Sequence, residues 1–199
     1  MAKKNNHNKI YDTRLVNYEI SKLQEISNNY SNFKINKIDL KKKIKFSISS
    51  DYTTNYLAEI LRLFLINKKI QPDITQSEFG SLRYDIRNLN GKFWNKKNDF
   101  FILIPSSENF SYLPKINDSK KIIDKKAIQE SQVWLNVWSK TDKNIIQTTF
   151  DPPLNPGLGS EDAVRYGGHL HFVRLVNSIL IEKLPSHVNL VDIENLIFK

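Results

Sequence analysis

The chain of 199 residues contains no cysteine. This absence excludes a disulfide framework and a metal site built on thiolates. No stretch approaches the roughly 18 consecutive apolar residues of a membrane-spanning helix, so no such helix is predicted. The first residues include lysines but lack the apolar segment of a secretory signal. Together these absences predict a cytoplasmic protein without a membrane partner.

Motifs for phosphate and nucleotide binding are also lacking. The sequence has no Gly-x-x-x-x-Gly-Lys-Ser/Thr, no Gly-x-Gly-x-x-Gly and no Asp-x-Asp. A P-loop, a dinucleotide-binding turn and an aspartyl nucleophile for phosphoryl transfer are therefore not expected. We predict no metal site and no cofactor in this chain.

Positive charge is concentrated near the N-terminus. The formal net charge is +9, and residues 1–45 hold 11 Lys/Arg against 4 Asp/Glu. This segment either attracts an acidic partner or reflects a composition rich in lysine and asparagine. No nucleic-acid motif accompanies it, so no nucleic-acid partner is expected. We expect residues 1–42 to form a basic arm with one helix, from about Arg14 to Ser27, and a linker.

Strand and helix patterns alternate along residues 43–199, which we expect to form one α/β domain. Strands are predicted over 44–49, 70–76, 100–104, 144–150 and 188–191, and helices over 54–68, 82–89, 120–138 and 170–183. Right-handed crossovers between such strands make a three-layer α/β/α sandwich with a flavodoxin-like parallel sheet. The expected strand order is 2-1-3-4-5.

The first of these helices has a stripe of apolar residues. Leu57, Ile60, Leu61 and Phe64 recur at helical spacing and predict its buried face. Thr53 or Thr54 is expected to cap its N-terminus.

Polar side chains follow every predicted strand. Because the carboxyl ends of parallel strands meet in one crevice, they predict a binding site there. The amides that open the helix at Thr54 suit an anion or an oxyanion. The residues expected to line this crevice, besides three catalytic candidates, are Ser49, Thr54, Glu78, Gly80, Ser106, Ser107, Glu108, Asn109, Asp151 and Asp192.

The catalytic candidates are Ser50, Asp51 and Thr53, which directly follow the first strand. Either Ser49 or Ser50 would be the nucleophile at this turn. A serine nucleophile needs a base. The chain has four histidines, at positions 7, 169, 171 and 187, and none is well placed to serve.

Several segments, in order, resemble one known family. They are SSDYTTNYLAEILRLFL, QPDITQSEFGSLRYDI, DFFILIP, IIQTTFDPP and HFVRLVNSIL. Residues 43–109 and 145–196 are similar to the N-terminal domain of FkbH-like proteins, which belong with the HAD-superfamily IIIC type. The resemblance covers about three quarters of the chain.

This resemblance implies a domain of the SGNH-hydrolase type that precedes a haloacid-dehalogenase (HAD) phosphatase domain. It further implies a role in loading a phosphoglycerate-derived unit onto an acyl carrier protein in polyketide-type biosynthesis. The expected partner is then the phosphopantetheine arm of that carrier, or a HAD-type domain. Magnesium is expected only with the HAD domain. Carrier proteins are typically acidic, which fits a basic arm.

The sequence departs from the SGNH pattern in three places. Ser50-Asp51-Tyr52 stands where that pattern has Gly-Asp-Ser, which puts Tyr52 in the nucleophile position. Residues 105–108 replace the Gly-x-Asn-Asp block, whereas Gly80 matches the block that supplies an oxyanion-hole amide. The closing Asp-x-x-His would lie beyond Lys199, so we expect a domain truncated at its C-terminus. No HAD motif occurs in the chain.

Three functions remain open from the sequence. The first is an accessory domain that has no catalysis of its own and serves a HAD-type domain. The second is an active SGNH-type esterase or acyltransferase that uses Ser49 or Ser50. The third is a flavodoxin-like domain that binds a small molecule.

Overall fold

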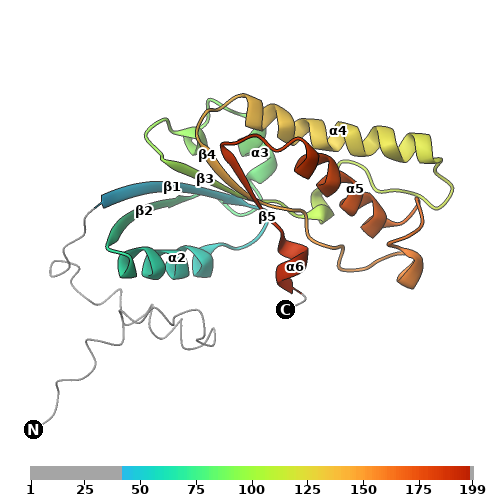
Figure 1. The fold of residues 1–199 in the computed structure, drawn as a ribbon, viewed down its shortest axis with the longest axis horizontal. Helices are drawn as coiled ribbons and strands as arrows, with labels where there is room; N and C mark the ends of the chain where they lie inside the picture. The colour runs from blue at the N-terminus through green and yellow to red at the C-terminus, as the bar shows by residue number, and fades with distance from the viewer. Residues whose placement is uncertain (1–41, 198–199) are drawn as a thin grey trace, which may run out of the picture. The chain divides into compact units, whose positions relative to one another are not determined.

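The computed structural model describes residues 42–197. The predicted arm and its helix lie outside the described residues. Within 42–197, every helix is too short or too polar to span a lipid bilayer. The strands are β1 (Lys42–Ser50), β2 (Ile70–Gln76), β3 (Phe100–Ile104), β4 (Asn144–Thr148) and β5 (Val188–Val191). The α-helices are α2 (Asn55–Asn67), α3 (Leu82–Arg87), α4 (Lys120–Ser139), α5 (His169–Glu182) and α6 (Ile193–Ile197), and the 3-10 helices are η4 (Lys92–Trp94), η5 (Ser107–Asn109) and η6 (Gly159–Glu161) (Figure 1).

The five strands form one parallel sheet flanked by helices, in the order β2-β1-β3-β4-β5. Strand β3 pairs with β4 from Phe100 opposite Asn144, and β4 pairs with β5 from Ile145 opposite Val188. The predicted α/β class and strand order are therefore confirmed. Pro72 lies in β2, an edge strand, where a missing backbone N–H is tolerated.

The chain divides into two compact units. The described part of unit 1 comprises residues 42–46 and 53–75, and that of unit 2 comprises residues 47–52 and 76–197. In unit 1, an ion pair links the first two strands, with Lys43 Nζ 3.1 Å from Asp73 Oδ2.

Helix α2 buries a different set of residues from the predicted one. Ala58, Leu63 and Ile66 are its buried residues, whereas Leu57 is 41% exposed. The helix is apolar on most of its sides, so its periodicity does not fix which side faces inward. Thr54 occupies the N-cap position, but its side chain makes no capping hydrogen bond, which corrects the predicted cap.

Unit 2 has a large aromatic core. Helices α4 and α5 pack against each other, as Figure 1 shows. All three tryptophans of the chain are buried in this unit, at Trp94, Trp134 and Trp138. The indole N–H of Trp138 donates to Gln147 Oε1 on β4 at 2.9 Å. Helix α4 is thereby anchored to the sheet by apolar packing and by a buried hydrogen bond.

Candidate functional site

The turn after β1 is held by the Ser50 hydroxyl. Ser50 Oγ donates to the Ile104 carbonyl at 3.2 Å and accepts from the Tyr52 amide at 2.8 Å. The Asp51 amide also donates to the Ile104 carbonyl, at 3.0 Å. These bonds tie the end of β1 to the end of β3. The hydroxyl of Ser50 is therefore engaged in the turn on both its donor and its acceptor side.

Beyond this turn, side chains from the ends of three strands meet. The Tyr52 hydroxyl lies 2.6 Å from Asp151 Oδ2 and 2.8 Å from Ser106 Oγ. The Ser106 amide donates to Asp51 Oδ2 at 2.9 Å, and the Ser107 amide donates to Asp151 Oδ1 at 2.8 Å. We call Asp51, Tyr52, Ser106, Ser107 and Asp151 the strand-end cluster. All five belong to unit 2.

The donors and acceptors of this cluster follow from its chemistry. A carboxylate only accepts, so the single phenolic proton of Tyr52 is donated to Asp151. The oxygen of Tyr52 then accepts the proton of the Ser106 hydroxyl. Each of the two hydroxyl groups thus donates one hydrogen bond. Asp151 accepts one bond from the Tyr52 phenol and one from the Ser107 amide.

The Tyr52 phenol retains its proton far into the alkaline range. Burial raises the pKa of Tyr52 above that of free tyrosine, and the hydrogen bond to Asp151 raises it further. The Ser106 hydroxyl acts in the opposite direction, because it stabilises the phenolate. The net result is a neutral phenol at Tyr52. A protonated phenol is a hydrogen-bond donor and not a nucleophile.

The cluster contains two carboxylates, and the phenol and backbone amides that donate to them are neutral. Asp51 is 8% exposed, and its Oδ1 has no hydrogen-bond partner among the described residues. The same holds for the fully buried Ser107 Oγ. Two buried polar atoms are thus left to accept or donate bonds to a bound water or ligand. Within residues 42–197, no three acidic or histidine side chains gather as a metal site.

Ser49 does not contribute to this cluster by any hydrogen bond that the structure defines. Its Oγ donates to Asp85 Oδ2 on α3 at 2.6 Å, and Ser81 Oγ lies 3.0 Å from the same oxygen. Ser49 is 1% exposed. Successive side chains of a strand point to opposite faces, which explains why Ser49 and Ser50 have different partners.

The other predicted residues have varied surroundings. Glu108 accepts from the Leu154 amide at 3.3 Å, and the Asn109 carbonyl accepts from Arg83 Nη2 at 2.8 Å. Asp192 accepts from the Asn195 amide in the first turn of α6, at 3.2 Å. Each of these three groups has a structural partner.

The remaining predicted residues are Thr53, Thr54, Glu78 and Gly80. Gly80 has a φ of 73° and completes an exposed turn in which the Ser81 amide donates to the Glu78 carbonyl. Thr53 and Thr54 belong to unit 1. From the predicted set, hydrogen bonds bring together Ser50, Asp51, Ser106, Ser107 and Asp151. The amides of Glu108 and Asn109 also donate to Ser106, at its Oγ and its carbonyl oxygen.

No described histidine forms a hydrogen bond with a serine hydroxyl. His187 Nε2 lies 3.0 Å from the Trp138 carbonyl, and His171 Nδ1 lies 3.4 Å from the Ala163 carbonyl. The buried Nε2 of His169 has no partner among residues 42–197. A serine–histidine pair of the kind that activates a hydroxyl is absent from the described part of the chain.

Three residues of these networks, Tyr52, Ser81 and Asp85, were not among the predicted site residues. Tyr52 has a sequence signal, since it occupies the third position of Ser50-Asp51-Tyr52. Asp85 has none, because its contact with Ser49 spans 36 positions and depends on how α3 packs.

The fold and the strand-end cluster define an α/β protein with polar side chains at the ends of its parallel strands. Its fold is similar to that of the N-terminal part of protein BF1531 from Bacteroides fragilis, with a TM-score of 0.66 and 14% sequence identity over 89% of this chain. That structure is described as containing a phosphatase domain complexed with Mg. This chain spans 45% of its length. No protein-family model and no curated protein match the chain.

Proposed function

We propose that this chain is the α/β domain of an FkbH-like protein and has no catalytic activity by itself. In this role it is accessory to a HAD-type phosphatase and glyceryl-transfer domain. That domain loads a phosphoglycerate-derived unit onto the thiol of an acyl carrier protein. The present chain holds the carrier, or its phosphopantetheine arm, in position for the transfer.

The main support is the state of the hydroxyl groups at the strand ends. Ser50 is engaged in the turn, Ser49 is bonded to Asp85, and Tyr52 donates to Asp151. None of them has a histidine partner among residues 42–197. Acyl transfer from a serine requires an activated oxygen, and removing members of a catalytic triad reduces kcat by several orders of magnitude. This arrangement favours an accessory role over an SGNH-type esterase.

The fold likeness adds separate support. The similar structure from Bacteroides fragilis is longer than this chain and contains a phosphatase domain. An α/β fold of this type therefore occurs within a longer protein that contains a phosphatase domain. Together with the resemblance of the sequence, this supports a phosphatase-type domain as the catalytic partner.

A titration with a phosphopantetheinylated acyl carrier protein tests the proposal. We expect NMR shifts on the labelled carrier, localised around its prosthetic arm, when the full chain is added. Carrier without the arm is the matched control, and its shifts should be smaller. The absence of shifts with either carrier would overturn the accessory role.

Hydrolysis of p-nitrophenyl acetate tests the absence of catalysis. We expect the wild type to hydrolyse this ester no faster than its Ser49→Ala and Ser50→Ala variants. A rate above background that is lost in either variant would instead identify an esterase.

A further inference from the structure

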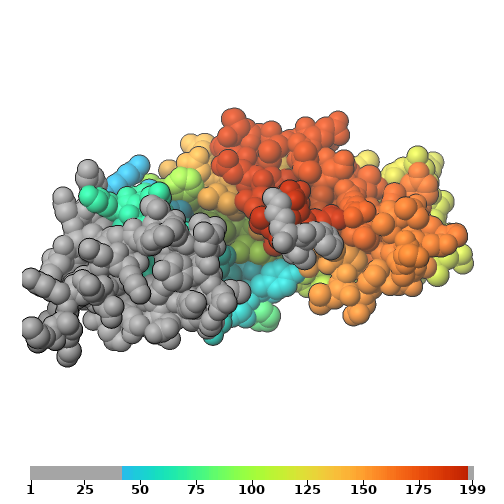
Figure 2. All heavy atoms as spheres, turned by 60° about the horizontal axis from the view of Figure 1, so that its bottom comes forward, coloured from blue at the N-terminus to red at the C-terminus, as the bar shows by residue number. Residues whose placement is uncertain are grey.

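One end of unit 2 exposes lysines and large apolar side chains together. Lys120 Nζ lies 5.3 Å from the centre of the Tyr166 ring, which joins the start of α4 to the loop before α5. Gly167 packs against the loop before α4, since a Cβ there would lie 2.8 Å from Ile116 Cα. Figures 1 and 2 show the orange loop and the yellow start of α4 at this same end.

The exposed apolar members of this surface are Ile116, Ile128 and Tyr166, which are 73%, 54% and 41% exposed. The exposed basic members are three lysines of α4. We call these six residues the α4 patch: Ile116, Lys120, Lys121, Lys125, Ile128 and Tyr166. An apolar surface surrounded by charge is typical of a protein-binding site.

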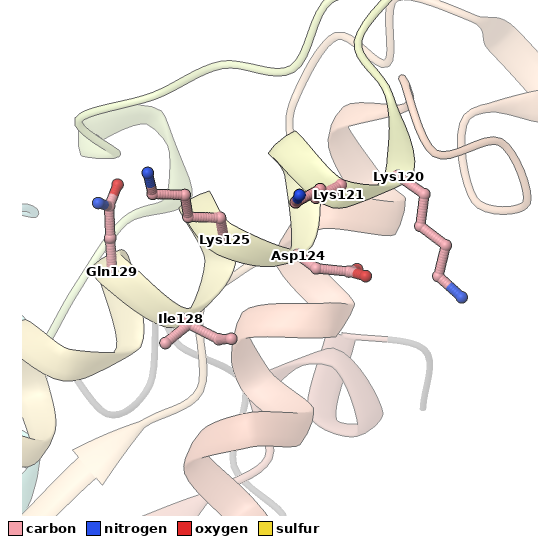
Figure 3. Close-up of a pocket in the computed structure, with 6 residues that line it drawn as sticks. All are labelled: Lys120, Lys121, Asp124, Lys125, Ile128 and Gln129. Carbon is pink, nitrogen blue, oxygen red and sulfur yellow. The ribbon is translucent and has the colours of Figure 1, made fainter.

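The patch includes a shallow hollow of about 700 Å³ on α4. Figure 3 shows its lining, in which Lys120 and Lys125 extend from the helix in different directions. All of the lining residues belong to α4. Because no second element among residues 42–197 covers the hollow, a partner can reach it. The lining residues are Lys120, Lys121, Asp124, Lys125, Ile128 and Gln129.

The charges of the patch are unfavourable to the helix that holds them. Positive charge near a helix N-terminus opposes the helix dipole, and the first turn of α4 has no acidic residue. Lys121 and Lys125 are four positions apart, a spacing at which like charges repel. In the described part of the chain, neither has an ion-pair partner, and Asp124 interacts with Lys120. A partner with negative charge would remove this repulsion.

We propose that the α4 patch is the docking surface for an acidic amphipathic helix of the acyl carrier protein. The carboxylates of such a helix pair with Lys121 and Lys125, and its apolar side chains cover Ile128 and Ile116. The exposed isoleucines favour a protein over a nucleic acid, because binding to a nucleic acid is dominated by its charged phosphates. This proposal rests on the proposed function, because the carrier is the partner proposed there.

Charge-reversal variants of the full chain test the docking surface. We expect Lys121→Glu combined with Lys125→Glu to weaken carrier binding, measured by calorimetry, by about tenfold or more, because like charges would then face each other. The matched control is Lys96→Glu combined with Lys97→Glu, which changes the charge equally at exposed positions between η4 and β3. This control should change the affinity for the carrier less than about twofold, because charges outside the interface contribute little to binding.

A second variant separates the apolar contribution from charge. Ile128→Ser removes an exposed apolar side chain without changing the charge, and we expect it to weaken carrier binding in high salt as well as in low salt. Circular dichroism should show that each variant remains folded, since all of the substituted residues are exposed.

The outcomes distinguish this proposal from the proposed function. If the wild type binds the carrier and the α4 variants bind equally well, the docking surface is wrong and the accessory role stands. If the wild type does not bind the carrier, the proposed function fails and the docking proposal fails with it. Binding to phosphatidylglycerol vesicles that depends on Lys121 and Lys125, with carrier binding unchanged in the same variants, would identify a membrane surface instead.

Discussion

The Tyr52 hydroxyl connects two loops that are far apart in sequence. Its proton goes to Asp151, 99 positions away, and its oxygen accepts from Ser106. We expect Tyr52→Phe to lower the free energy of unfolding by about 1–3 kcal/mol, because Asp151 and Ser106 each lose a partner. Urea denaturation measures this change. Tyr56→Phe is the matched control, since Tyr56 is 62% exposed, and a loss of equal size there would contradict the role of the bond.

A second tyrosine predicts how stability depends on pH. The Tyr112 hydroxyl donates to the Asp118 carboxylate. Burial and this bond raise the pKa of Tyr112 to about 12, and the same bond lowers the pKa of Asp118. Above the unfolded pKa of about 10, the unfolded tyrosine loses a proton that the folded one retains. The contribution of Tyr112 is therefore complete below pH 10 and is lost between pH 10 and about 12.

The comparison of wild type with Tyr112→Phe measures this contribution. We expect the difference in unfolding free energy to be constant around neutral pH and to shrink as the pH rises above 10. It should also shrink at acid pH, as the pH falls from the ordinary pKa of an aspartate through the lowered pKa of Asp118. A difference that stays constant up to pH 11 would contradict the assignment.

At the scale of elements, a buried ion pair joins α3 to α4. Arg83 Nη2 lies 2.7 Å from Glu130 Oε1, and Glu130 is 2% exposed. Ser111 Oγ also donates to this carboxylate, at 2.9 Å. We expect Arg83→Met to lower the free energy of unfolding by about 3 kcal/mol, because it leaves a buried carboxylate without its cation.

The matched control for this pair is on the surface. Arg62 Nε lies 3.9 Å from Glu59 Oε2 on α2, and the two side chains are 35% and 46% exposed, far more than Glu130. Arg62→Met should lower the free energy of unfolding by less than about 1 kcal/mol. Equal losses for the two arginine variants would show that burial of Glu130 contributes nothing.

The loop before α5 is packed too closely for a side chain at Gly168. A Cβ there would lie 1.9 Å from the Asp162 carbonyl oxygen, although its φ of −78° suits any residue. We expect Gly168→Ala to lower the free energy of unfolding by about 2 kcal/mol or more. Gly157→Ala in the same loop meets no atom within 4 Å and should be neutral within about 0.5 kcal/mol. Thermal unfolding of both variants measures this contrast.

The elements of the sheet were largely predictable from the sequence. Strands over Ile70–Gln76, Phe100–Ile104 and Val188–Val191 match the predicted ranges. Short apolar strands separated by periodic helices permit few arrangements once crossovers are right-handed. The buried face of α2 was predicted wrongly. In a helix that is apolar on most sides, the spacing of apolar residues does not identify the side that faces the core.

The candidate site was predictable to the level of strand ends and no further. Ser106, Ser107 and Asp151 follow the strands that the pattern placed side by side. A hydrogen bond joins Ser107 to Asp151 directly, and the Tyr52 hydroxyl links Ser106 to Asp151. Which hydroxyl meets which carboxylate depends on loop conformations that involve residues far apart in sequence. The partnership of Ser49 with Asp85 also depends on the packing of α3, which no local pattern specifies.

At the scale of the whole molecule, the positions of the tryptophans determine which part of the chain intrinsic fluorescence reports on. All three indoles lie in unit 2. Intrinsic fluorescence therefore follows the unfolding of unit 2, whereas far-ultraviolet circular dichroism follows the helices of both units. Coincident curves would show that the units unfold as one cooperative body, and a separate dichroism transition would belong to unit 1. The three tryptophans thus report on the folding of unit 2 without any added label.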